Sequence, residues 1–188
     1  MKYEENIECI DWDYIWKKEL GKKKREKKDW NDIADKFGRW IEKDDYPIKL
    51  LNHVKVSPTD SVMDLGCGEG TITIPLAKKS GHLLAVDKSD KMLDLIQAKM
   101  IDEGLSNIIT LRQDILTLNK DNIGQYDVIV ASRSINSAYN MKEVLSNLND
   151  IARKYVYISF YGPNNRKEEN KALEAIGKKV PRKFDEYI

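Results

Sequence analysis

Two kinds of segment alternate along the chain from Ser61 onward. Short runs rich in β-branched residues are separated by stretches in which apolar residues recur every three or four positions. These patterns are typical of strands and of amphipathic helices. The strands are expected at Ser61–Leu65, His82–Asp87, Asn107–Leu111, Tyr126–Ala131 and Tyr155–Phe160. The helices are expected at Thr71–Lys79, Ser89–Glu103, Tyr139–Arg153 and Arg166–Lys178. The alternation predicts an α/β fold with a doubly wound, mostly parallel sheet.

Residues 1–53 have a different pattern, and we expect them to form a helical extension, rich in aromatic and charged residues, ahead of a main domain at residues 54–188. The sequence Trp12–Leu20 predicts a short helix or an extended arm, and Leu50–Val54 predicts a helix after a break near Pro47. One further helix is predicted by apolar residues spaced by three and four, namely Trp30, Ile33, Ala34, Phe37, Trp40 and Ile41. The aromatic side chains either pack on the main domain or form a lid over a substrate pocket.

The composition of the chain narrows its class. With 188 residues, 41% hydrophobic and 34% charged, the chain is long enough for one domain with a real core. No apolar run approaches the roughly 20 residues that a membrane span needs, and the first residues lack the layout of a secretory signal. Cys9 and Cys67 cannot form a zinc site alone. We therefore expect a cytoplasmic protein with reduced thiols, without a membrane partner and without a bound metal.

Basic residues are concentrated near the N-terminus. The segment Lys17–Lys28 carries eight basic and two acidic residues. Such a run is either a solvated helix face or a contact for the phosphates of RNA or of another anionic partner, with Lys22–Lys28 as its centre.

The strongest chemical signal follows the first expected strand. Glycines at positions 66, 68 and 70 come directly after this strand and open a helix. Glycines at such a junction let the backbone turn sharply and approach a ligand closely. The next strand ends in Asp87, 21 residues after Gly66, where an acid can accept hydrogen bonds from both hydroxyls of a ribose. The order of these elements predicts a site for a nucleoside-containing cofactor.

The glycine spacing distinguishes between cofactors. The dinucleotide-binding fingerprint, Gly-x-Gly-x-x-Gly or Ala, requires Gly or Ala at the position where this chain has Thr71. The segment Asp64–Gly70 instead resembles the D-x-G-x-G-x-G motif of class I S-adenosylmethionine (SAM)-dependent methyltransferases, and the resemblance covers residues 54–160. It implies a Rossmann-like fold, SAM as cofactor and S-adenosylhomocysteine (SAH) as product.

The resemblance also implies a set of contacts. Asp87 and Lys88 match the second motif, where the acid holds the ribose, and Met92 lies where family members often pack a Met against the adenine. Asp114 and Ile115 match the third motif, at the adenine amino group and ring, and the fourth strand ends facing the methyl group. The full set of implied cofactor residues is Asp64, Gly66, Cys67, Gly68, Gly70, Asp87, Lys88, Met92, Asp114, Ile115 and Ser132.

The sequence identifies no catalytic residue. In-line transfer of the activated methyl group to a nucleophile rests largely on positioning, and neither His53 nor His82 is a promising base. Ser132–Asn136 lacks the Asn/Asp-Pro-Pro-Tyr/Phe pattern of family members that methylate adenine or glutamine nitrogen. Arg133 either holds an acceptor carboxylate or phosphate, or pairs with a structural acid. Small molecules, proteins and RNA remain open as acceptors.

Two other functions remain open as alternatives to a SAM-dependent methyltransferase. One is a SAM-binding domain without catalysis that serves as a partner or RNA-binding subunit. The other is a nicotinamide-dependent oxidoreductase, which the residue at position 71 disfavours.

The length of the chain also bears on the fold. Family members usually continue into a C-terminal β-hairpin, but only 28 residues follow the fifth expected strand. The hairpin is therefore expected to be missing, and the domain to be truncated at its C-terminus. Three explanations are open: a minimal variant, a fragment of a longer protein, or a homodimer in which a second subunit covers the open sheet edge.

Overall fold

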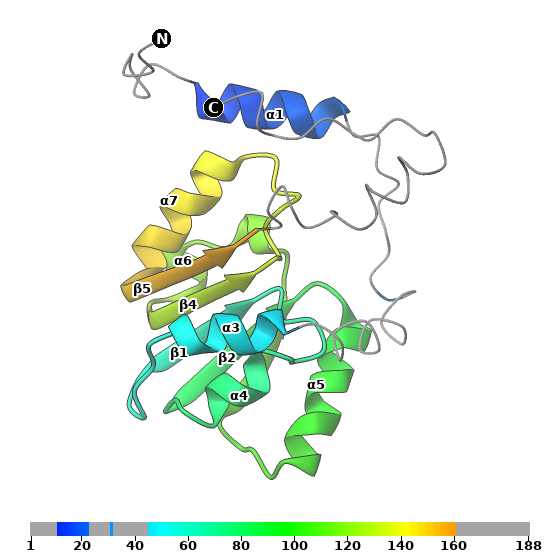
Figure 1. Cartoon of the computed structure of the whole chain (residues 1–188), viewed down its shortest axis with the longest axis vertical. Helices are drawn as coiled ribbons and strands as arrows, with labels where there is room; N and C mark the ends of the chain where they lie inside the picture. The colour runs from blue at the N-terminus through cyan, green and yellow to red at the C-terminus, as the bar shows by residue number, and fades with distance from the viewer. Residues whose placement is uncertain (1–10, 23–30, 32–44, 161–188) are drawn as a thin grey trace. The chain divides into compact units, whose positions relative to one another are not determined.

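The computed structural model describes residues 11–22, 31 and 45–160 (Figure 1). Five strands are present among them, namely β1 (Ser61–Leu65), β2 (His82–Asp87), β3 (Ile108–Arg112), β4 (Tyr126–Ser132) and β5 (Ala152–Ser159). The helices are α1 (Trp12–Lys22), α3 (Tyr46–His53), α4 (Thr73–Ala77), α5 (Asp90–Asp102), the 3₁₀ turn η2 (Ile115–Thr117), α6 (Lys120–Ile123) and α7 (Met141–Ile151). By backbone contacts the chain divides into two units, residues 1–158 and 159–188, and the features discussed below lie in the first.

The five strands form one sheet in the order β3-β2-β1-β4-β5. β1 pairs in parallel with both β2 and β4, and β2 pairs in parallel with β3. Figure 1 draws β5 in the same direction as β4. The chain moves outward from β1 first to one side and then to the other, so the sheet is doubly wound, as the sequence predicts.

Apolar side chains from both faces of the sheet build two layers of core. On one face, Val62 and Val128 pack with Ile74 of α4 and Ile96 of α5. On the other face, Met63 of β1 packs with side chains of α7. Because helices cover both faces, all five residues of β1 are buried, as expected for a central parallel strand.

The strand predictions differ in quality between the centre and the edges of the sheet. β1 and β2 have the predicted bounds, whereas β3 is shifted by one residue and β5 begins three residues early, directly after α7. β3 is also half-solvated, with Ile109 66% exposed, because it is an edge strand in this sheet. The predicted Thr71–Lys79 helix is shorter in the structure, since only α4 is helical.

Part of the N-terminal region can be compared with its prediction. α1 is a helix, which decides between the helix and the extended arm. Pro47 lies in the first turn of α3, where its missing N–H disrupts no helical hydrogen bond. The predicted helix around Trp30–Ile41 lies outside the described residues except for Asn31, and so do Cys9, residues 23–28 of the basic run and the predicted Arg166–Lys178 helix. The proposed boundary after residue 53 stays a prediction.

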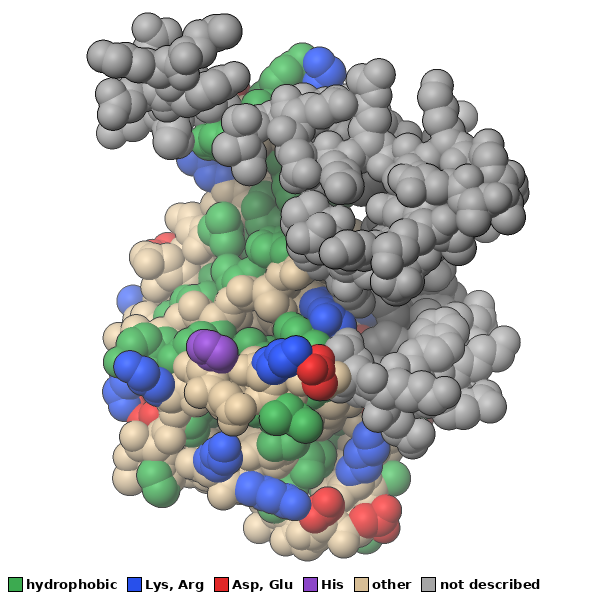
Figure 2. Space-filling view, viewed as in Figure 1, with side chains coloured by type: hydrophobic (Ala, Val, Ile, Leu, Met, Phe, Trp, Pro, Cys, Tyr) green, Lys and Arg blue, Asp and Glu red, His purple; other side chains and the backbone are tan. Residues whose placement is uncertain are grey.

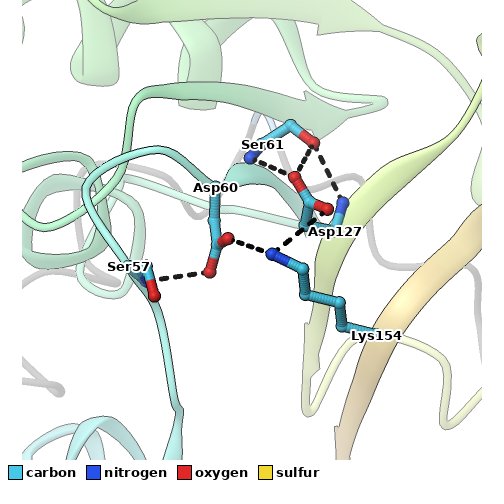
Figure 3. Close-up of polar contacts among 5 residues, drawn as sticks. All are labelled: Ser57, Asp60, Ser61, Asp127 and Lys154. Atoms are coloured by element: carbon cyan, nitrogen blue, oxygen red, sulfur yellow. Dashed lines mark hydrogen bonds and ion pairs between the residues drawn. The ribbon is translucent and has the colours of Figure 1, made fainter.

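A polar network joins β1, β4 and β5 at their amino ends (Figure 3). The backbone N–H and the hydroxyl of Ser61 both donate to the Asp127 carboxylate, at 2.9 and 2.8 Å. The Lys154 ammonium of β5 bonds Asp60 and lies 3.4 Å from Asp127, and the backbone N–H of Ser57 donates to Asp60 at 2.8 Å. The Lys154 hydrogen bond holds the pKa of Asp60 below its usual value. The network fixes β5 against the rest of the sheet, at the edge opposite the site described next.

A helix that spans a membrane has to be both long and apolar. Within the described ranges, no helix is both long enough and apolar enough to cross a bilayer.

Candidate functional site

The loops that follow β1, β2, β3 and β4 lie at one edge of the sheet, because the carboxyl ends of parallel strands share an edge. This edge is where doubly wound folds bind their ligands. Nearly all the candidate residues of the sequence analysis lie in these loops or at the ends of the helices that follow them.

The glycine-rich loop Gly66–Gly70 is held against β2 by its own backbone. The N–H groups of Gly66 and Cys67 both donate to the Val86 carbonyl, at 2.7 and 3.1 Å. Gly66 has a φ of +66°, and a Cβ there would lie 2.3 Å from the Cβ of Ser134. The loop after β1 therefore packs directly on the loop after β4, and only a glycine fits at the contact.

Asp87 links this loop to the start of α5. One carboxylate oxygen accepts a hydrogen bond from the backbone N–H of Gly68 at 3.0 Å, and the other from the N–H of Ser89 at 2.9 Å. Ser89 caps α5 by accepting from the Met92 N–H at 3.2 Å, and its hydroxyl donates to the side chain of Asn31 at 2.7 Å. The acid that the sequence assigns to the ribose is thus fixed beside the glycine loop.

The residues assigned to the adenine end, together with Lys88 of the ribose motif, lie in different settings. Met92 is 1% exposed, in the first turn of α5, and Lys88 is exposed. Asp114 is exposed and caps η2 by accepting from the Leu116 N–H at 3.0 Å, while Ile115 packs partly on the core. The capping role of Asp114 occupies one of its oxygens, and its part in binding adenine stays a prediction.

The end of β4 carries a cluster that sequence reasoning found only in part. The hydroxyls of Ser132 and Tyr46 lie 2.8 Å apart, and the Arg133 guanidinium stacks on the Tyr46 ring, 3.5 Å from its centroid. Arg133 also has a φ of +53°, a conformation that costs an L-residue about 1–2 kcal/mol. Tyr46 was missed because it lies 86 residues before Ser132, and no local pattern marks it.

Asp64 points into the domain. It is 1% exposed, and its carboxyl group accepts a hydrogen bond from the Thr73 hydroxyl at 2.7 Å. Burial raises the pKa of Asp64 to about 7. Thr73 is itself fully buried. Sequence reasoning missed it, because a threonine nine residues after an acid offers little signal.

The remaining reactive side chains are poorly placed for catalysis. Cys67 is buried, and burial raises the pKa of its thiol far above the usual value, which disfavours the thiolate. His53 bonds the backbone carbonyl of Lys49 on its own helix, and His82 is at the amino end of β2. Within the described residues, no group of three or more His, Cys, Asp or Glu side chains is arranged to hold a metal ion.

Sequence comparison assigns this arrangement to a family. A family model described as a methyltransferase domain matches residues 57–186. The chain belongs to this methyltransferase family. An uncharacterized protein of Haemophilus influenzae is 31% identical over 133 residues, which are 71% of this chain and 48% of that protein. A probable ribosomal RNA small subunit methyltransferase A of Methanosphaera stadtmanae is 28% identical over 83 residues, 44% of this chain and 30% of that protein. The chain thus spans about half or less of the length of these relatives.

Structural comparison places the fold in the same class. A crystal structure of coclaurine N-methyltransferase bound to N-methylheliamine and SAH superposes with a TM-score of 0.57. The alignment has 21% sequence identity and covers 64% of this chain and 36% of that one. A likeness at this level establishes the fold, which confirms the predicted Rossmann-like methyltransferase architecture.

Proposed function

We propose that this chain is a SAM-dependent methyltransferase that binds its cofactor at the carboxyl edge of the sheet. The observation that carries the proposal is the carboxylate of Asp87, held by two backbone N–H groups beside the glycine loop of a methyltransferase domain. Two carboxylate oxygens offer about four lone-pair positions. The two backbone bonds leave acceptor capacity for a pair of ribose hydroxyls, so the residues present fit the cofactor.

The resemblance of the motifs divides the cofactor among these loops. The backbone of the glycine loop would hold the amino-acid end, Asp87 the ribose, and the end of β4 would face the methyl group. The proposed cofactor residues remain those implied by the sequence: Asp64, Gly66, Cys67, Gly68, Gly70, Asp87, Lys88, Met92, Asp114, Ile115 and Ser132.

Bound SAM supplies an activated methyl group, so the protein's task is to place the acceptor in line with it. We assign this task to the cluster at the end of β4. Ser132 and Tyr46 offer two hydroxyls to a polar acceptor, and the stacking of Arg133 on Tyr46 fixes the plane of its guanidinium group. No group is assigned the role of general base.

RNA is the acceptor class that we propose to test first. Support comes from the ribosomal RNA methyltransferase among the relatives and from the basic run Lys17–Lys28. On the face drawn in Figure 2, the Lys and Arg side chains of the described residues are spread among other side chains and form no single patch. The proposal for RNA therefore depends on the basic run. Binding to a single-stranded RNA should weaken steeply with salt, and a flat salt dependence would count against it.

The cofactor proposal is tested by calorimetric titration with SAH. Wild-type protein should bind, and Asp87→Ala should bind at least 100-fold more weakly, since it loses two charge-assisted hydrogen bonds of about 1.5–3 kcal/mol each. Asp90→Ala is the matched control, because Asp90 is an exposed acid three residues further on that pairs with Arg112. A folded wild-type protein that binds neither SAM nor SAH would rule out the proposal.

Catalysis is tested separately from binding. Labelled SAM incubated with the protein and a cell extract should transfer label, and prior treatment of the extract with ribonuclease should abolish the transfer if RNA is the acceptor. Cofactor binding without any transfer would favour the non-catalytic alternative. Binding of NADH in place of SAH would favour an oxidoreductase.

The proposal also covers the cellular compartment and the oligomeric state of the protein. We propose a cytoplasmic protein, because Cys67 is a free buried thiol of the kind that reducing compartments maintain. Among the described residues β5 is the outermost strand on its side of the sheet, and of the three explanations left open by the sequence we propose to test the homodimer through that edge. Light scattering at several protein concentrations tests the dimer.

A further inference from the structure

α1 has two different sides, one docked on the domain and one exposed. On the docked side, the Trp16 indole N–H donates to the Ala138 carbonyl at 2.6 Å, and the ring is partly buried against the core. Lys17 pairs with Asp13 at 2.6 Å and lies 5.7 Å from the centroid of the Tyr139 ring. These contacts anchor α1 to the loop between β4 and α7.

This loop is the one that carries the proposed acceptor cluster. It leaves β4 at Ser132 and reaches Ala138 six residues later. Between these points it is closed by hydrogen bonds of its own. The side-chain amide of Asn136 donates to the Arg133 carbonyl at 3.0 Å, and the Ala138 N–H donates to the Ile135 carbonyl at 3.0 Å. A molecule bound to the exposed side of α1 is therefore held beside the proposed acceptor site.

The exposed side of α1 carries aromatic rings beside a cation. Tyr14 is 61% exposed, and Trp12, the first residue of the helix, is 48% exposed. Lys18 is exposed as well, and its ammonium lies 5.8 Å from the centroid of the Tyr14 ring. Residues four apart lie on the same side of a helix, and residues two apart lie on nearly opposite sides, so Tyr14 and Lys18 point away from the side that Trp16 docks. We call Trp12, Tyr14 and Lys18 the outer surface of α1.

The charge of the neighbouring chain decides which partner fits the outer surface. The last turns of α1 belong to the run Lys17–Lys28, with its eight basic and two acidic residues. Lys17 is paired with Asp13, whereas none of the described carboxylates pairs with Lys18. Proteins bind single-stranded nucleic acid with such a combination, because bases stack on aromatic rings and cations attract the phosphates. A helix on a membrane instead buries an apolar side, and that side of α1 is already docked.

We propose that the outer surface of α1 binds single-stranded RNA, with unpaired bases stacked on Tyr14 and Trp12 and a phosphate on Lys18. This inference rests on RNA as the acceptor class of the proposed function. It adds base stacking to the purely electrostatic contact of the basic run. Bases in a duplex are paired and stacked on one another, so the outer surface should prefer a single strand to a duplex.

The experiment is fluorescence anisotropy of the full chain with a short labelled RNA that has no self-complementarity, beside a duplex RNA of the same length. Tyr14→Ala and Trp12→Ala should each weaken binding of the single strand about tenfold, as expected when one base loses its aromatic ring. Tyr14→Phe keeps the ring and should bind within about threefold of wild type. Tyr155→Ala is the matched control and should bind as wild type does, because Tyr155 is 46% exposed but lies on β5.

Salt dependence separates stacking from charge. Each phosphate contact with a single strand adds about 0.7 to the slope of log affinity against log salt concentration. Lys18→Gln should therefore lower the magnitude of the slope by about 0.7. Tyr14→Ala should leave the slope unchanged while it lowers the affinity at every salt concentration. Thermal melts should stay close to wild type for each variant, since these side chains lie on the surface, and they establish that a loss of affinity is not unfolding.

The outcomes separate this inference from the proposed cofactor function. Wild-type protein that does not bind the single strand overturns the inference, whatever its affinity for SAH. Tyr14→Ala that binds as tightly as Tyr155→Ala overturns it too, and so does equal affinity for the duplex. Binding to vesicles that contain phosphatidylserine, in place of RNA, overturns it in favour of a membrane surface. Wild-type protein that binds the single strand but neither SAM nor SAH contradicts the proposed function and leaves the RNA surface standing.

Discussion

Substitution of Gly66 by alanine probes the contact between the cofactor loop and the loop after β4. The new methyl group would lie 2.3 Å from the Cβ of Ser134, much closer than two carbon atoms can approach. One of the two loops has to move, and the Gly66 N–H would then lose its 2.7 Å hydrogen bond to the Val86 carbonyl. We expect loss of stability and of cofactor binding together.

The loss of unfolding free energy in Gly66→Ala has two parts, and a matched control variant separates them. Alanine at a φ of +66° costs about 1–2 kcal/mol, and relief of an overpacked contact costs a further 1–3 kcal/mol or so. Gly104 has nearly the same backbone angle, with a φ of +62°, but nothing within 4 Å of its Cβ position. Gly104→Ala therefore measures the backbone effect alone.

Denaturant unfolding of both variants provides the assay, with SAH titration beside it. Gly66→Ala should be destabilised by at least about 1 kcal/mol more than Gly104→Ala, and only Gly66→Ala should lose SAH affinity. Equal free energies of unfolding for the two variants would refute the packing of the β4 loop on the glycine loop.

Three further predictions concern the scaffold. Ile129→Ala in the buried centre of β4 should lose about 2–5 kcal/mol of unfolding free energy, whereas Ile109→Ala on exposed β3 should lose far less; equal losses in denaturant melts would contradict the core assignment. Ser89→Ala removes the α5 cap and should lose about 1 kcal/mol, and unchanged stability would argue against that cap. The depressed pKa of Asp60 stabilises the fold at neutral pH, and this contribution disappears as the pH falls through the folded-state pKa. The gap in Tm between wild type and Lys154→Met should therefore be clear at pH 6 and shrink towards pH 3, and a gap that stays constant would contradict the ion pair.

The central strands could be predicted from sequence because burial on both faces leaves an unbroken apolar run. β1 and β2 match their predicted bounds for that reason. β5 begins earlier than predicted, because the predicted Tyr139–Arg153 helix takes in Ala152 and Arg153, which already belong to the strand. Ile109 of β3 is solvated, and the sequence could not predict this, because strand order, which decides what covers a strand, is not written in a local pattern.

The candidate site was predictable where it depends on neighbouring residues in the chain. The glycine loop and Asp87 follow from strand-loop-helix order, and both lie at the expected edge. The pairs Tyr46–Ser132 and Asp64–Thr73 are set by tertiary packing, and no spacing rule connects their members. The alternation of β1 does place Asp64 on the same face as Val62, which is the one sequence signal that its side chain points into the core.

The proposed cofactor site consists of the glycine loop and Asp87. A crystal structure of the chain grown with SAH tests it most directly. We expect to find the ribose hydroxyls on the Asp87 carboxylate and the homocysteine portion along Gly66–Gly70. SAH bound elsewhere on the chain, with Asp87 still bonded only to Gly68 and Ser89, would rule out this cofactor site.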